Sequence, residues 1–197
     1  MSKLTFDAEK HIYRLDDNII PSVTQIMQPL NQRAYDGIDQ AIMDNAAARG
    51  TAVHEAAEFY ARYRAEECPE EYAGYFKAFK DWFSSYRVNV VKTEQAYYHP
   101  HLLYAGTIDL IAEVDGKLMI VDYKTTHTIK DMLTRVQLEA YARMISAQGQ
   151  GVAGKAILQL RRDGSYTFKN YKNPDFEAWD VFASLLKIKA YTEKYGG

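Results

Sequence analysis

The stretch of residues 106–126 constrains the fold of this chain most, because it predicts a tight β-hairpin. The pair Asp115-Gly116 lies between two apolar, β-prone runs, and both residues accept the positive φ angles of a two-residue turn. The runs are apolar on both faces, which is typical of strands that helices cover on each side. We expect one face to hold Ile108, Leu110, Val121 and Tyr123, and the other Ile111, Leu118 and Ile120.

The register of this hairpin predicts a cluster of charges at its open end. If Val114 pairs with Lys117, Asp109 lies directly opposite Asp122, and opposed residues share a face with Cβ atoms roughly 4.5–5.5 Å apart. Lys124, two residues beyond Asp122, shares that face. Two such close carboxylates repel each other unless a cation lies between them, and their hard oxygen atoms suit Mg²⁺ or Mn²⁺. On this reasoning alone, a solvated hairpin end without any site is an equal alternative.

Composition bounds the class of protein. A chain of 197 residues with 47% hydrophobic and 25% charged residues fits one globular domain. The net charge of −2 does not indicate a nucleic-acid-binding protein, although acidic residues elsewhere can offset a local basic strip. Cys68 is the single cysteine, so this chain supplies neither an internal disulfide nor a four-cysteine zinc or iron–sulfur site. The sequence contains no apolar run long enough to span a membrane and no signal sequence, which predicts a cytoplasmic location.

The first third of the chain predicts a ribbon followed by helices. Residues 4–15 alternate loosely and predict a short ribbon or hairpin. Ser22 is a suitable N-cap for a short helix that Pro29 would end. The alanine-rich stretch 39–66 predicts either one bent helix or two helices that meet near Gly50.

The rest of the chain predicts strands and helices that form one mixed sheet between helices, an α/β fold. Pro69 starts a helix with an aromatic stripe, which we interpret as core rather than as a base-stacking surface. Pro174 is expected in the first turn of the last helix. The other expected elements are a strand at 88–98, a helix at 130–147, and a hairpin of residues 156–161 and 166–171.

Four polar residues outside the central hairpin are candidates for supporting a site there. Gln137 and Tyr141 share one face of the expected helix 130–147, where they either border the core or reach over the sheet toward the carboxylates. Glu94 lies within a strand, where it is either solvated or an additional acidic ligand. His54 is either structural or a nitrogen ligand that completes an oxygen-rich metal site.

Four sequence blocks follow one another along the chain. They are Arg49-Gly50-Thr51-Ala52-Val53-His54, Gly106 to Asp109, Asp122-Tyr123-Lys124-Thr125, and Gln137 with Tyr141. In this order and spacing they resemble the PD-(D/E)XK nuclease superfamily, and within it the RecB-like and phage-type exonucleases. The stretch Ile20 to Ile26 resembles the N-terminal segment of the phage-type members, so the resemblance covers residues 20–141.

The resemblance implies a fold and a domain organisation. The fold would be a restriction-endonuclease-like core, in which helices flank a central mixed β-sheet. Residues 1–197 would form a single nuclease domain. Its parts would be an N-terminal ribbon and short helix (1–30), a helical part (31–86), and the sheet core with its flanking helices (87–197).

The resemblance also implies roles for single residues around a metal ion. Asp109, Asp122 and Lys124 would be catalytic, the carboxylates as metal ligands and the lysine as the group that orients the attacking water. The backbone carbonyl of Tyr123 and the ring of His54 would be further ligands. Three residues have secondary roles, Glu94 as an acidic ligand and Gln137 and Tyr141 as supporting or DNA-contacting side chains. The residues Lys155, Arg161, Arg162 and Lys169 would form a basic DNA-binding surface or, equally, an ordinary charged hairpin.

The implied activity is that of a Mg²⁺- or Mn²⁺-dependent deoxyribonuclease, an exonuclease rather than an endonuclease, in DNA recombination, repair or phage DNA processing. DNA would be the substrate. A recombinase, an annealing protein or a helicase would suit as a partner, self-association is compatible with the resemblance, and no membrane is expected. Some relatives hold an iron–sulfur cluster through four cysteines. This chain has a single cysteine, Cys68, so we expect no such cluster here. The alternative is a non-catalytic DNA-binding or complex-assembly module on a nuclease scaffold.

Overall fold

The computed structural model describes residues 3–8 and 10–196, so residues 1, 2, 9 and 197 of the expected domain lie outside the described part. The strands are β1 (Leu4–Asp7), β2 (Ile12–Leu15), β3 (Asn18–Ile20), β4 (Val88–Tyr98), β5 (Ala105–Val114), β6 (Lys117–Lys124), β7 (Gly154–Leu160) and β8 (Tyr166–Tyr171). The helices are α1 (Val23–Ile26), α2 (Gln28–Ala34), α3 (Gln40–Tyr63), a 3₁₀ turn (Glu70–Tyr72), α4 (Ala73–Ser85), α5 (Asp131–Ala147) and α6 (Phe176–Tyr195). No helix in the described ranges is long and apolar enough to cross a lipid bilayer.

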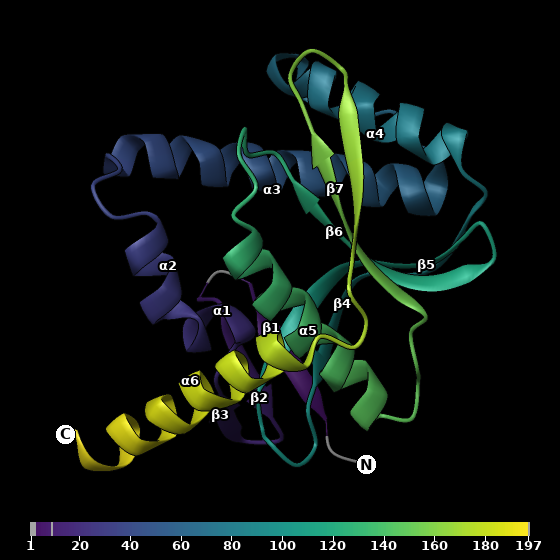
Figure 1. Ribbon diagram of the computed structural model, residues 1–197. Helices are drawn as coiled ribbons and strands as arrows, with labels where there is room; N and C mark the ends of the chain where they lie inside the picture. The colour runs from purple at the N-terminus through teal and green to yellow at the C-terminus, as the bar shows by residue number, and fades with distance from the viewer. Residues whose placement is uncertain (1–2, 9, 197) are drawn as a thin grey trace.

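The strands form a five-stranded sheet and a smaller ribbon (Figure 1). The sheet has the order β4-β5-β6-β7-β8, with β6 and β7 parallel and all other neighbours antiparallel. The helix α5 connects the two parallel strands, as such a crossover requires. The strands β1, β2 and β3 form the antiparallel ribbon. The structure therefore has the mixed sheet and flanking helices expected from the sequence.

Helices cover both faces of the sheet. On one face α3 and α4 pack against the strands, and Phe79 and Trp82 of α4 are fully buried there. On the opposite face lie α1, α5 and α6, which bury Leu138 and Phe182 among others. Figure 1 shows these two layers on opposite sides of the strands. The aromatic stripe of α4 is therefore core, as its spacing indicated.

The central hairpin has the predicted two-residue turn. Asp115 and Gly116 adopt φ angles of 49° and 81°, a left-handed conformation that an Asp-Gly pair accepts. Val114 pairs with Lys117, and the ladder continues in the predicted register as far as Leu110. The predicted register is confirmed over this length.

One expected face of the hairpin is wrong. Ile108 packs with Ile111 and Ile120 in the cluster under α5, whereas Leu110 packs in the cluster under α3 and α4. Residues 108 and 110 would share a face in a regular strand. The alternation therefore changes at Asp109, where the ladder with β6 has already ended.

Two prolines occupy other positions than expected. Ser22 caps α1 in a capping box, but Pro29 lies in the first turn of α2, where its missing N–H and fixed φ are tolerated. Pro174 lies before Asp175, the N-cap residue of α6, whose carboxylate accepts a hydrogen bond from the N–H of Ala178. Pro174 thus lies outside α6 because Asp175 supplies the cap, whereas Pro29 lies at the start of a second helix directly after α1.

The alanine-rich stretch forms one helix, α3, that runs through Gly50. A glycine within a helix costs about 0.5–1 kcal/mol relative to alanine. The half of α3 that follows Gly50 packs on the sheet, where Val53 and Ala57 are completely buried. This burial offsets the cost of the glycine, so the break that the sequence allowed does not occur.

Lys155 was expected on a DNA-binding surface, and this expectation is wrong. Its side chain is 1% exposed, and its ammonium group donates a hydrogen bond to the equally buried Glu139 of α5. The same carboxylate accepts hydrogen bonds from Arg143 at 2.9 Å and from the backbone N–H of Asp175 at 3.0 Å. A buried charge persists only when it is paired and hydrogen-bonded, and this network meets that condition.

We predict that Lys155→Met lowers the free energy of unfolding by about 3–5 kcal/mol, because it leaves a buried carboxylate without its main partner. Adding Glu139→Gln should recover part of this loss, since glutamine still accepts the Asp175 N–H without a charge. Lys169→Met, which breaks a pair with Asp131 on the surface, should cost less than about 1 kcal/mol. Urea unfolding of the variants measures these changes. A single variant as stable as the wild type would contradict the buried pair's role.

Candidate active site

Five side chains from four elements meet at the open end of the central hairpin. The carboxylates are Glu94 on β4, Asp109 on β5 and Asp122 on β6. Lys124 ends β6, and His54 lies in the middle of α3, which crosses the sheet above these strands. The structure therefore brings together residues that are up to 70 positions apart in the sequence, all of which the sequence analysis had selected.

His54 connects three strands. Its Nδ1 lies 3.6 Å from a carboxylate oxygen of Asp109 and 3.7 Å from one of Glu94. Its Nε2 donates a hydrogen bond of 3.2 Å to the backbone carbonyl of Tyr123. Because a carbonyl only accepts, this bond places a proton on Nε2 and leaves Nδ1 directed at the carboxylates. Nδ1 is therefore the ring atom that would bind a cation there, in place of a second proton.

Glu94 and Asp109 reach α3 because both strands depart from regular alternation. The pairs of Thr93 with Leu110 and of Gln95 with Ile108 enclose them. Glu94 has a φ of 43°, a left-handed conformation that is uncommon for residues other than glycine and that clusters at functional sites. As a result Thr93 and Glu94 both point toward α3, Thr93 to Arg62 and Glu94 to His54.

The two aspartates of the hairpin point to different helices, although one face was expected for both. Asp109 accepts a hydrogen bond of 2.7 Å from the N–H of Tyr123 with one oxygen and turns the other toward His54. Asp122 forms an ion pair of 2.7 Å with Lys124 on the side of α5. The expectation of a shared face assumed a regular ladder, and the ladder ends before Asp109.

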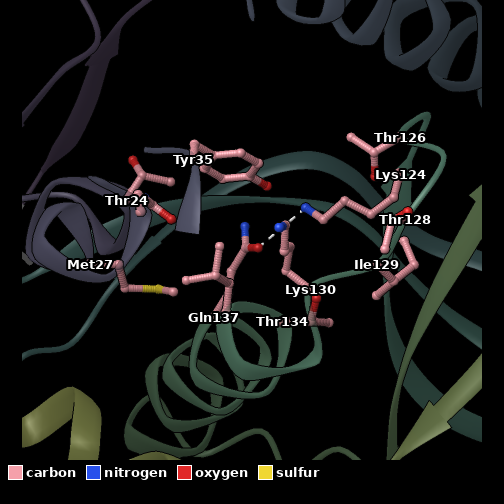
Figure 2. Close-up of a pocket in the computed structure, with 12 residues that line it drawn as sticks. Thr24, Met27, Tyr35, Lys124, Thr126, Thr128, Ile129, Lys130, Thr134 and Gln137 are labelled. Carbon is pink, nitrogen blue, oxygen red and sulfur yellow. Dashed lines mark hydrogen bonds between the residues drawn. The ribbon is translucent and has the colours of Figure 1, made fainter. Parts of the chain in front are cut away.

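Gln137 and Tyr141 hold Lys124 in place from α5. The ammonium group of Lys124 donates a hydrogen bond of 3.2 Å to the side-chain oxygen of Gln137, whose amide donates in turn to the hydroxyl of Tyr141 at 3.0 Å. Figure 2 shows the bond between Lys124 and Gln137 at the wall of a cavity of about 270 Å³. Of the two alternatives for this pair, Gln137 reaches the charged cluster over the sheet, whereas Tyr141 also packs in the core.

Two lining residues of that cavity were not found from the sequence. Tyr35, the residue that follows α2, and Lys130 line this cavity together with Lys124 (Figure 2), and the Lys130 ammonium lies 5.7 Å from the centre of the Tyr35 ring. Nothing in the sequence near either residue marks it, because only the fold brings both residues close to Lys124. A second cavity, of about 490 Å³, borders His54 and Glu94 from the other side.

Electrostatics at the cluster favours a bound cation. Burial lowers the pKa of His54, but Asp109 and Glu94 outweigh it and raise this pKa above its usual value. Burial raises the pKa of Asp109; His54 opposes this, and Asp122 and Glu94 add to it. Burial also lowers the pKa of Lys124, which Asp122 and Asp109 raise more strongly. The pKa values of all three groups are thus raised overall, although burial and the neighbouring charges act in opposite directions on each. Strongly perturbed pKa values in one place are typical of functional sites.

The residues present fit a divalent cation. One ligand atom each from His54, Glu94 and Asp109 lies within 4.8 Å of the other two. An oxygen of Glu94 is buried there without a hydrogen-bond partner among the described residues, which is costly unless a bound group satisfies it. Carboxylate oxygens with one imidazole nitrogen suit a divalent ion. Asp122 lies outside this group of three, and its oxygen faces Lys124 instead.

The remaining predicted residues lie on the second hairpin. Arg161 donates hydrogen bonds to Gln159 at 2.8 Å and to Thr167 at 2.7 Å, and Arg162 borders a cavity next to it. Lys169 is paired with Asp131. Together with the buried Lys155, this leaves the two arginines as the candidates for contact with a nucleic acid.

Comparison with known proteins is consistent with this arrangement. A model of the PD-(D/E)XK nuclease superfamily matches residues 74–193, which include the whole five-stranded sheet and α5. A solved structure, that of SSO0001, aligns over 86% of this chain and 83% of its own length, with a TM-score of 0.36 and 13% sequence identity.

Two curated relatives bear the name mitochondrial genome maintenance exonuclease 1. The protein of Xenopus tropicalis is 25% identical over 221 residues, covering 98% of this chain and 62% of its own length. The protein of Mus musculus is 26% identical over 210 residues, covering 91% of this chain and 61% of its own length. This chain thus spans about three fifths of the length of these relatives.

We predict that Mn²⁺ raises the unfolding temperature of the protein and that Asp109→Asn abolishes this shift. A ligand at 100 times its Kd stabilises the folded state by about 2.7 kcal/mol. Asparagine keeps an acceptor for the Tyr123 N–H, so the metal-free variant should fold, but it removes one charged ligand. Thermal unfolding with and without Mn²⁺ tests this, with Asp81→Asn on the exposed face of α4 as the control. A full shift in Asp109→Asn would rule out this cation site.

Proposed function

This chain belongs to the PD-(D/E)XK nuclease superfamily, and from this premise we propose that it is a metal-dependent DNA exonuclease. Mg²⁺ or Mn²⁺ is the proposed cofactor and DNA the proposed substrate. The observation that supports this most is the meeting of His54, Glu94 and Asp109 beside the Asp122–Lys124 pair. Phosphodiester hydrolysis requires a site for a metal ion and, next to it, a positive group that compensates the negative charge on the phosphoryl oxygens.

The proposed roles follow from the positions of the side chains. Asp109, His54 and Glu94 would hold a divalent cation. The carbonyl of Tyr123 and the carboxylate of Asp122, which the sequence also suggested as ligands, border this group but have His54 and Lys124 as their partners. Such a cation, when bound, lowers the pKa of a water and polarises a phosphoryl oxygen. Hydrolysis adds a water oxygen to phosphorus and releases an alcohol, so negative charge accumulates on the phosphoryl oxygens in between.

Lys124 is the residue proposed to respond to that charge. Its ammonium group is held between Asp122 at 2.7 Å and Gln137 at 3.2 Å, and it is partly exposed to the cavity of Figure 2. Asp122 and Asp109 raise its pKa and so keep it charged, and Asp122 and Gln137 orient it before substrate arrives, which is the preorganisation that electrostatic catalysis needs. Gln137 and Tyr141 therefore act as positioning residues.

The proposed exonuclease activity rests on the names of the two relatives, whose alignments cover 98% and 91% of this chain but only 62% and 61% of their own lengths. Arg161 and Arg162 are proposed to contact the DNA backbone. A single nuclease domain over residues 1–197 is also proposed, supported by the bond of 2.8 Å between Tyr13 of the ribbon and Thr107 of the sheet. A recombinase, annealing protein or helicase partner, self-association and a cytoplasmic location stay predictions of the sequence.

We expect Lys124→Ala to reduce Mg²⁺-dependent degradation of DNA at least about 100-fold, the usual effect of removing a preorganised charge-stabilising group. Lys117→Ala, an exposed lysine at the other end of the same strand, is the matched control and should leave the rate unchanged. Release of labelled nucleotides measures the rate. A protein that binds DNA but never degrades it would favour the non-catalytic alternative, and Lys124→Ala with full activity would refute this role.

We further expect linear DNA to be degraded while a covalently closed circle of the same sequence persists, because an exonuclease needs a strand end. Gel electrophoresis of both substrates after equal incubation separates the cases. Linearisation of the circle at a comparable rate would identify an endonuclease instead.

A further inference from the structure

A cavity of about 390 Å³ lies immediately beyond Lys124, and its lining includes the two arginines already proposed to contact DNA. Thr125 and Thr126, the two residues that follow Lys124, form one wall. Thr126 also lines the cavity beside Lys124, so the two cavities are neighbours on either side of this residue. The 390 Å³ cavity is therefore within reach of a chain-like ligand that extends past the end of β6.

Arginines dominate the walls of this cavity. Arg49, Arg161 and Arg162 line it, against one carboxylate, Asp163. That carboxylate already accepts hydrogen bonds from the N–H and hydroxyl of Ser165, at 2.9 and 2.7 Å. The cavity thus has an excess of positive charge, and guanidinium groups are the usual partners of phosphate oxygens.

Close backbone packing holds the two sides of the cavity together. Gly74, at the start of α4, lies so near the carbonyl of Arg162 that a Cβ atom would collide with it. This approach places the turn between β7 and β8 against α4 (Figure 1). Arg162 and Tyr75 consequently border the same space.

A planar platform completes the cavity. The guanidinium of Arg49 lies 5.6 Å from the centre of the Tyr75 ring, and its Nε donates a hydrogen bond of 3.3 Å to the hydroxyl of Thr125. Nucleobases stack on aromatic rings and on arginine planes when they are unpaired, since pairing holds them inside a duplex. A positive groove with such a platform is typical of single-strand binding.

We propose that this cavity binds one unpaired nucleotide of the DNA substrate, its phosphate on the arginines and its base against Arg49 and Tyr75. The inference rests on the proposed function, and it adds the place where the strand leaves the charged cluster and the state of that strand. It assigns a binding role to Arg49, which opens the first of the four sequence blocks, and to Tyr75, which lies in none of them.

The test measures binding without cleavage. Fluorescence anisotropy in EDTA gives the Kd of a labelled single-stranded oligonucleotide and of a blunt duplex of equal length. We expect Tyr75→Leu to raise the Kd for the single strand about 5-fold or more, as loss of one stacked base does, with little change for the duplex. Tyr75→Phe, which keeps the ring, should bind like the wild type.

Arg162→Gln provides a second, independent variant. It should weaken single-strand binding several-fold and reduce the slope of log K against log salt by about 0.7, the value for one phosphate contact of a single strand. Its matched control is Arg87→Gln, an exposed arginine at the turn end of the central hairpin, which should change neither quantity. Thermal unfolding of each variant shows whether a loss arises from misfolding, and if Tyr75→Leu does not fold, Arg162→Gln decides.

The outcomes separate this inference from the proposed function. If both variants bind single strands as the wild type does, the cavity has no such role. If the variants raise the Kd for the duplex as much as the Kd for the single strand, the cavity contacts the backbone of any DNA. That result would overturn the inference that it binds an unpaired nucleotide. A wild-type protein that neither binds nor degrades DNA would refute the proposed function itself.

Discussion

The hydrogen bond from the backbone N–H of Tyr123 to the carboxylate of Asp109, at 2.7 Å, is the contact on which the candidate site depends. In a regular antiparallel ladder a backbone carbonyl of the neighbouring strand would accept such an N–H. Here the side chain of Asp109 accepts it. The ladder of the hairpin therefore ends at the pair of Leu110 with Val121 and does not continue to Tyr123. The bond also orients Asp109, whose second oxygen is left to face His54 at 3.6 Å. Because the Asp109 carboxylate takes the place of a backbone acceptor, the two strands separate here and Asp109 becomes available as a metal ligand.

Two carboxylates of this protein, the buried Glu139 and the partly exposed Glu94, show how structural and functional charges differ. Glu139 accepts hydrogen bonds from Lys155, from Arg143 and from a backbone N–H. Its carboxylate is therefore fully occupied within the structure and holds α5 against the neighbouring elements. Glu94 has a left-handed backbone and a buried oxygen without a partner among the described residues. Conformational strain and an unsatisfied charge both reduce stability. They are retained where a ligand can compensate for them, and here they coincide with the group of His54, Glu94 and Asp109.

Much of the fold could be predicted because it follows from local rules. The turn at Asp115-Gly116, the core face of α4 and the position of α5 depend on φ preferences and on helical spacing within a few residues. The errors concern residues whose state depends on distant packing. Gly50 does not break α3 because the following turns are buried against the sheet, and Lys155 is inside because Glu139 lies opposite it on α5. Neither partner is visible from the local sequence.

Residue order alone was enough to predict the hairpin, its register as far as Leu110, and the blocks that contain His54, Asp109, Lys124 and Gln137. These depend on turn chemistry and residue identity, which are properties of short segments. The tertiary structure alone decided which carboxylate meets the histidine and which one pairs with the lysine. It also decided that the cavity beyond Lys124 joins residues of α3, α4 and the β7–β8 turn. The physical reason is that side-chain direction at the end of a ladder depends on the neighbouring strand and helix, and regular alternation no longer holds there.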